Sequence, residues 1–276
     1  MKKIIYFLLA LLLSLMLYFG TKAYYYAIAY EQYTTELISH KGATEQAKRQ
    51  LSKFAKSILG DLYNDETKTS LDAIKTQQTH AMKEAKVFTS YFMIALVLLL
   101  LLSYFFMSLR KFTIVGAIAA MIALFFGLIT PILMVTIHKE VDYLGDIVLS
   151  FESKGIAGSI TKLWKGGDIV VALVIFLFSV LTPILKILSL LFVSFFIKNK
   201  FAHNIVNFFK LIGKWSMIDV FVVAIFLVYL TANKGDVSRA EVEVGLYFFL
   251  AYVLVSMIVS LSADKMLHQK KTNKQK

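Results

Sequence analysis

Cysteine is absent from this chain of 276 residues, and proline and tryptophan occur twice each. A chain without cysteine forms no disulfide, binds no metal through thiolates and has no cysteine nucleophile. Its five histidines are scattered without the spacing of metal ligands, so no metal site is predicted. The sequence also contains no GxxxxGK(S/T) phosphate-binding loop, no HExxH zinc motif and no GxSxG nucleophile motif. These absences indicate a protein that is not an enzyme and carries no cofactor.

Charged residues are also scarce, at 17% of the chain, whereas 58% of the residues are hydrophobic. Several uninterrupted apolar runs reach the ~20 residues that a helix needs to cross a bilayer. No alternation with a period of two, typical of a membrane barrel, is visible. The sequence therefore predicts an all-α, polytopic membrane protein with six transmembrane helices, at Ile4–Gly20, Phe88–Leu109, Phe112–Ile137, Ile169–Ile197, Trp215–Ala232 and Val244–Ala263.

The distribution of lysine and arginine predicts the side of the membrane that each loop faces. With a cytoplasmic amino terminus, the cytoplasmic pieces hold 13 of these residues and the two short outer loops hold six. Because positive charge near span ends marks the cytoplasm, we expect both termini to be cytoplasmic, with a basic tail over residues 264–276. The net charge of +12 fits contact with anionic headgroups, and no basic and aromatic patch indicates nucleic-acid binding.

Residues 21–87 form the one sizeable soluble region, in which apolar residues recur at helical spacing. This pattern predicts an extracytoplasmic helical hairpin that extends the first two spans. Residues 1–20 fit a retained signal anchor or a cleaved signal peptide. The cluster Tyr24–Tyr26 is typical of an aromatic belt at the outer interface. In the second outer loop, His138–Asp168, we expect an amphipathic helix over Ile147–Trp164.

Two charged side chains fall inside the predicted spans, and every other one can be placed in a loop, a tail or the soluble region. Lys186 lies near the middle of the fourth span, and Asp219 lies in the first turn of the fifth. A charge at membrane depth is costly and usually turns toward a partner, a cavity or a pathway. We therefore expect a functional role for Lys186, whereas Asp219 is either a functional group or a cap at the helix amino terminus.

Thr182, Lys186 and Ser189 recur at positions i, i+4 and i+7 and so form a polar stripe on one helix face. This stripe predicts a pocket suited to a lipid headgroup, an ion or protons, with interhelical hydrogen bonding as the alternative. Both prolines follow a threonine, in the contexts ITPIL and LTPIL. Because proline removes a backbone donor, we expect a helix kink at Thr130 and Pro131. At Pro183 a purely structural kink is less favoured, because Lys186 lies one turn further on.

The segment Gly213–Ala224, GKWSMIDVFVVA, resembles a Gly-x-Trp-Ser-Met-x-Asp-Val-Phe block of the paraquat-inducible protein A family. The stretch Thr182–Lys186 is similar to a Pro-x-x-Lys of that family, and Pro131 has a counterpart in the first span of the same module. The resemblance covers about residues 112–263 as a single four-span module. By matching motifs it implies that the functional pocket includes Pro183, Lys186, Trp215, Ser216 and Asp219.

The resemblance also implies a role in bacterial envelope lipid transport, in which phospholipid passes between the inner membrane and a periplasmic mammalian-cell-entry-type protein. Family members often carry two modules and a zinc ribbon with paired CxxC motifs, whereas this chain has one module and no cysteine. The resemblance gives no account of the first two spans and the region between them.

Two functions of other classes stay open at this point. A membrane sensor or scaffold with an extracytoplasmic helical input region fits the first two spans, although the cytoplasmic side has only short connectors and a tail. An ion-coupled small-solute transporter is the other alternative, although no inverted repeat of several helices is evident.

Overall fold

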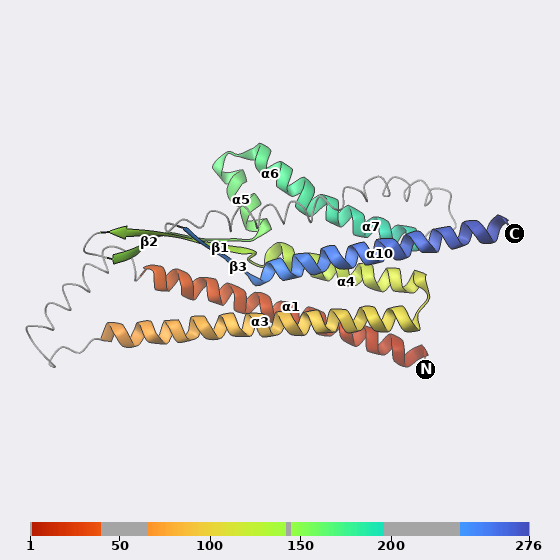
Figure 1. Cartoon of the computed structure of the whole chain (residues 1–276), viewed down its shortest axis with the longest axis horizontal. Helices are drawn as coiled ribbons and strands as arrows, with labels where there is room; N and C mark the ends of the chain where they lie inside the picture. Colours follow the sequence, from red (N-terminus) through yellow and green to blue (C-terminus); the bar gives the residue numbers. More distant parts are fainter. Residues whose placement is uncertain (1, 40–65, 142–144, 196–237, 276) are drawn as a thin grey trace, which may run out of the picture.

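The computed structural model describes residues 2–39, 66–141, 145–195 and 238–275. These residues form an elongated helix bundle, with both ends of the chain at one end and a small sheet at the other (Figure 1). We name these the terminal end and the sheet end. Within the described residues, five helices are long and apolar enough to cross a membrane. The chain is thus a predominantly helical, multi-pass membrane protein, as the sequence predicts.

The fifth predicted span, Trp215–Ala232, lies outside the described residues. Helix α7 (Thr182–Phe195) ends toward the terminal end, whereas strand β3 (Ser238–Val242) lies at the sheet end (Figure 1). The described residues that flank positions 196–237 therefore lie toward opposite ends of the bundle.

Helices α1 (Lys2–Ser39) and α3 (Glu66–Phe106) pack side by side along their lengths. Each is far longer than the ~20 residues that a bilayer requires, so the pair continues past the apolar zone toward the sheet end. Tyr26 stacks on Phe88, with ring centroids 5.6 Å apart, and Gln78 donates a 2.8 Å hydrogen bond to Thr34. Helices α1 and α3 thus run beyond the first two predicted spans, and the tip of the predicted hairpin lies outside the described residues.

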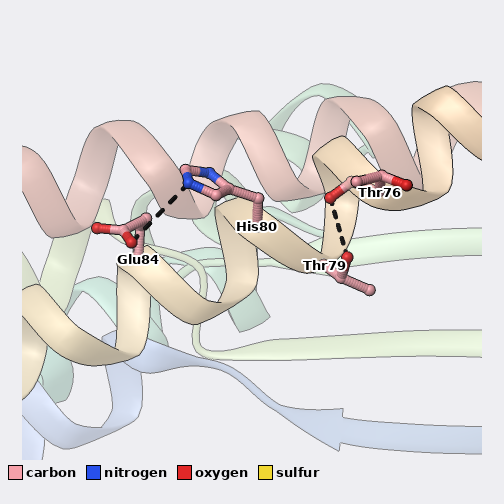
Figure 2. Close-up of polar contacts among 4 residues, drawn as sticks. All are labelled: Thr76, Thr79, His80 and Glu84. Atoms are coloured by element: carbon pink, nitrogen blue, oxygen red, sulfur yellow. Dashed lines mark hydrogen bonds and ion pairs between the residues drawn. The ribbon is translucent and has the colours of Figure 1, made fainter.

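The beginning of α3 has a polar face that makes its contacts within the helix (Figure 2). His80 Nε2 lies 3.9 Å from Glu84 Oε1, and the hydroxyl of Thr79 donates to the carbonyl of Thr76 at 2.9 Å. Local pairs of this kind, on exposed side chains, are typical of a helix surface in water.

The centre of the bundle is the crossing of α4 (Leu109–Ile129) and α10 (Val244–Gln275). Small residues on α4 allow this close approach. A Cβ atom added at Gly127 would lie 2.8 Å from the backbone nitrogen of Phe249, and one added at Gly116 would lie 2.5 Å from Val259 Cγ2. The two helices are therefore in backbone contact at Gly127.

Residues from α3 and α1 pack into this crossing and join the first two spans to the rest. Phe92 on α3 meets the ring of Phe248 edge to face, with centroids 4.8 Å apart, and the ring of Phe126 at 6.1 Å. Nearer the sheet end, Tyr30 and Ala81 form a buried cluster with Met134 of β1 (Leu133–Val141). The first two helices and the remainder of the bundle therefore share one core.

The sheet end holds a three-stranded antiparallel sheet that the all-α prediction lacked. Strand β1 lies between β2 (Gly145–Lys154) and β3. Strand β2 follows β1 directly in the chain, whereas β3 lies about 100 residues after β1. The predicted helix over Ile147–Trp164 is therefore wrong for its first half, which is strand β2, and correct for its second, which is α5 (Ile156–Gly166). Ile147, Leu149 and Phe151 alternate at the strand period, a pattern that the helical interpretation overlooked.

The predicted kink at Thr130 and Pro131 is instead the end of a helix. Helix α4 ends at Ile129, and Thr130 has extended angles of φ −80° and ψ 144° because a residue before proline avoids the helical region. The carbonyl of Pro131 then accepts a 2.8 Å hydrogen bond from the backbone of Gly245. The third span, predicted as Phe112–Ile137, is consequently shorter, and its last residues enter β1.

Candidate functional site

One membrane-crossing segment carries most of the predicted pocket and contains a break in helical register. It consists of α6 (Ile169–Phe176), the π-helical turn η2 (Leu177–Leu181) and α7. Pro183, which has no N–H, lies two residues after the end of this turn. The wider turn, a π-bulge, and the missing donor are therefore neighbours in the same segment.

The side chain of Thr182 forms a hydrogen bond with the backbone of this π-bulge. Both the N–H and the Oγ1 of Thr182 donate to the carbonyl of Leu177, five residues earlier, and the Oγ1 bond is 2.8 Å long. Thr182 thus stabilises the π-bulge, and its hydroxyl proton points along its own helix rather than toward a neighbouring one.

Lys186 lies one turn beyond Pro183 and is buried, with 8% of its surface exposed. It lies nine residues before the end of α7, a depth of about 14 Å from that end. Its Nζ donates a 3.2 Å hydrogen bond to the Oγ of Ser256 on α10. The Ser256 hydroxyl in turn donates to the carbonyl of Val253 at 2.9 Å, so it is oriented to accept from the ammonium.

Ser189 is the other predicted site residue on this part of α7. Its side chain is buried, and its hydroxyl donates a 2.6 Å hydrogen bond to the carbonyl of Lys186. That bond uses the proton and leaves the oxygen lone pairs as acceptors. The structure thus places the Lys186 ammonium against Ser256 of α10, with Ser189 bonded to the Lys186 backbone on α7.

The remaining predicted site residues divide into two groups. Trp215, Ser216 and Asp219 lie outside the described residues, so a pairing between Asp219 and Lys186 stays a prediction. Thr130 and Pro131 lie at the sheet end, where α4 passes into the sheet, and they do not join the lysine pocket.

Two buried polar residues of this region were missed by the sequence interpretation. Ser256 lies in an apolar run that also contains Ser260 and Ser262. The recurrence of serine in this run is the sequence feature that could have indicated a polar helix face. Glu243, with 1% of its surface exposed, was assigned to a loop, yet it is enclosed where α10 begins. Its backbone N–H donates to the carbonyl of Ile132 at 2.9 Å, which holds it against the chain that leaves Pro131.

Arg110 and Lys111, the two basic residues at the start of α4, contact neighbouring helices. Arg110 donates from Nε to the carbonyl of Ser194 at 2.7 Å and from Nη2 to that of Phe195 at 3.2 Å, so it caps the last turn of α7. Lys111 contacts the hydroxyl of Tyr6, and its Nζ lies 5.0 Å from the centroid of that ring. The start of α4 is thereby tied to α7 and to α1.

Comparison with known proteins places this arrangement in a family. A family profile described as paraquat-inducible protein A matches residues 109–272, more than half of the chain. The match begins at α4 and runs through α10, so it contains Lys186, Ser189 and Ser256 and leaves out α1 and α3.

Curated relatives agree with this match. The chain is 28% identical over 128 residues to the intermembrane transport protein PqiA of Escherichia coli strain K12, which covers 44% of this chain and 30% of the relative. It is 30% identical over 109 residues to a probable intermembrane transport protein of Haemophilus influenzae, which covers 37% of this chain and 26% of the relative. The matched part is thus less than a third of each relative's length.

No solved structure matches the chain. The resemblance of the segments around Pro183 and Trp215 is nevertheless confirmed by the independent match over residues 109–272. The chain belongs to the paraquat-inducible protein A family.

Proposed function

We propose that this protein is the inner-membrane component of a bacterial envelope lipid transport system. In this proposal a phospholipid headgroup enters a pocket around Lys186 and passes to a periplasmic mammalian-cell-entry-type partner. The observation that carries the proposal is the buried ammonium of Lys186, held at membrane depth by a hydroxyl from the neighbouring helix. The names of the relatives, which describe intermembrane transport, support the transport role.

The chemistry of the pocket suits a phosphate group. A buried ammonium is costly to place in a bilayer, and an anionic ligand offsets that cost. Ammonium and phosphate also form short, charge-assisted hydrogen bonds that are stronger than neutral ones. Lys186 would bind the phosphate, while Ser189 and Ser256 have oxygen lone pairs for headgroup donors such as an ethanolamine ammonium.

The π-bulge before the pocket supports a mechanism with movement. Single π-turns mark sites where a helix can change register at low cost. Proline has no backbone N–H, so one helical hydrogen bond is absent at the same place. A change at η2 would rotate Lys186 relative to Ser256, because the lysine is only one turn beyond Pro183. Binding and release of the headgroup would follow that rotation.

Trp215, Ser216 and Asp219 are proposed as the other pocket members. In this role the carboxylate of Asp219 would adjust the charge state of the site or relay a proton. The proposed orientation places the terminal end in the cytoplasm, where Arg110 and Lys111 lie, and the sheet end in the periplasm, where the partner would receive the lipid.

The test uses full-length protein with Lys186→Ala, Lys186→Arg and the control Leu185→Ala. Leu185 is the adjacent residue, and half of its surface is exposed, so its removal leaves the pocket unchanged. Transfer of labelled phospholipid from proteoliposomes to the purified periplasmic partner, or detergent sensitivity of cells, is measured. We expect the alanine variant to lose transfer, the arginine variant to retain part of it and the control to match the parent. Unchanged transfer by a folded Lys186→Ala protein would remove the proposed role.

A sensor or scaffold is the second candidate, and the length of α1 and α3 favours it. These helices extend well past the membrane-crossing length and share a core with β1 at the sheet end. Co-purification under mild detergent separates the two functions. Bound phospholipid or a mammalian-cell-entry-type protein supports transport, and a signalling kinase supports the alternative.

A further inference from the structure

Helix α5 is a short amphipathic helix with an unusual combination of composition and position. Its apolar side chains, Ile156, Ile160, Leu163 and Trp164, fall within an arc of about 100° at 3.6 residues per turn. The opposite side holds Lys165, and the helix contains no acidic residue. Such a stripe, narrow and bordered by basic charge, is typical of helices that lie at a membrane surface.

The position of α5 matches the level at which the chain enters the bilayer. Only Gly167 and Asp168 separate it from α6, where the membrane-crossing segment begins with the exposed side chains of Ile169, Val170 and Val171. In Figure 1, α5 runs crosswise to the long axis of the bundle, between the sheet and α6. A helix in that direction lies along the membrane plane when the bundle crosses the membrane.

The turn between the two helices fixes this geometry. Gly167 adopts φ 91°, a left-handed conformation that favours glycine, and the N–H of Asp168 donates to the carbonyl of Leu163 at 3.0 Å. The apolar stripe of α5 is thereby held in a defined rotation relative to the first turn of α6.

The described parts of the chain cover the stripe of α5 only in part. Ile156, Ile160 and Leu163 are partly buried, with Ile156 packed against the central core, whereas 57% of the Trp164 surface is exposed. Tryptophan favours the headgroup level because its ring is apolar and its indole N–H needs a polar partner. A neighbouring lysine can extend its ammonium to the phosphates while its stem stays among apolar groups.

We propose that α5 lies in the headgroup zone of the leaflet at the sheet end and binds the lipid surface through its apolar stripe. Trp164 and Leu163 face the acyl chains, and Lys165 faces the phosphates. The partner of this surface is the bilayer, since the stripe is continuous with the lipid-facing start of α6 and the charge of α5 is only positive. This contact sets the depth of α6 and keeps the sheet immediately outside the membrane.

Trp164 provides a direct test, because the chain has only one other tryptophan. The Trp215→Phe protein is reconstituted in nanodiscs whose lipids are brominated either just below the headgroup or near the acyl terminus. We expect Trp164 emission to lose most of its intensity with shallow bromines, less with deep ones and little with aqueous acrylamide. Strong acrylamide quenching without a bromine effect would overturn the proposal. So would protection from all quenchers, which is the result for a protein-covered face.

A matched pair of labelling sites gives a second measurement that does not need the Trp215 substitution. Since the chain has no cysteine, Ile160→Cys and Thr161→Cys each accept one spin label, on the apolar and polar sides of α5 respectively. We expect the label at 160 to collide more with oxygen dissolved in lipid and the label at 161 to collide more with an aqueous nickel chelate. Equal aqueous accessibility at both sites, or a reversed contrast, would contradict the proposal.

Discussion

The ammonium of Lys186 and the hydroxyl of Ser256 meet at 3.2 Å across the interface of α7 and α10. They are 70 residues apart in the chain, and each is buried among apolar side chains. The contact joins the segment that contains the π-bulge to the helix that forms the centre of the bundle. It therefore couples the proposed binding site to the closely packed pair of α4 and α10.

Ser256→Ala should lower the free energy of unfolding by about 1 kcal/mol, because interhelical hydrogen bonds in membranes contribute on that order. Ser260→Ala, one turn further along α10, is the control and should be close to neutral, since Ser260 is only partly buried. Unfolding in mixed micelles, followed by circular dichroism, measures both. Equal losses for the two serines would show that the lysine contact does not contribute.

The close approach of α4 and α10 predicts a larger effect at Gly127. A methyl group there would lie 2.8 and 2.9 Å from the backbone N and Cα of Phe249, and backbone atoms cannot move aside as a flexible side chain can. Gly127→Ala should therefore cost about 1–3 kcal/mol, as overpacking of a core usually does.

Gly158→Ala is the matched control for this substitution. Among the described residues outside its own helix turn, no atom lies within 4 Å of the position where its Cβ would stand, and the residue is inside α5. Alanine there should raise stability by about 0.5–1 kcal/mol, because glycine is the weaker helix former. A stable Gly127→Ala protein with unchanged α4 and α10 packing would contradict the backbone contact.

Arg110 should control the order of the last turn of α7. Removing its side chain leaves the carbonyls of Ser194 and Phe195 without these donors. Arg110→Ala should therefore speed hydrogen exchange of the amides in the last turn of α7, while the exposed Lys265→Ala, also a loss of one positive charge, should leave them unchanged. Arg110→Lys should give an intermediate rate, because lysine keeps the charge without the fork of guanidinium donors. Identical rates in all variants would exclude the cap.

Much of the fold follows from local sequence, because a membrane span is defined by the length of an apolar run. The fourth and sixth spans begin at Ile169 and Val244, as predicted. The sheet could not be found in this way, since β1 and β3 pair across a separation of about 100 residues and each strand is short. Pro131 illustrates the same limit. The proline ends α4, but the local sequence predicts only a kink, because the pairing of β1 that follows depends on distant residues.

The candidate site was predictable only in part for a related reason. Lys186 can be recognised from the sequence alone, because it is a charged residue inside a long apolar run. Its partner Ser256 does not, because the rotation of α10 that turns this serine toward α7 depends on packing against Gly127 and Gly116. Glu243 was hidden because its burial results from the chain around Pro131, which covers it from another segment.

Phe92 tests whether the first two helices and the family module unfold as one unit. It belongs to α3, outside the residues matched by the family, yet it is fully buried against Phe126 and Phe248. Phe92→Ala should cost about 2 kcal/mol, less than in a water-soluble core, since lipid is as apolar as the lost contacts and only packing is forfeited. Tyr91→Ala is the control, because half of that side chain is exposed. We expect a single unfolding transition that shifts as a whole in Phe92→Ala. Two separate transitions, with only the α1 and α3 signal affected, would show that the two parts are independent.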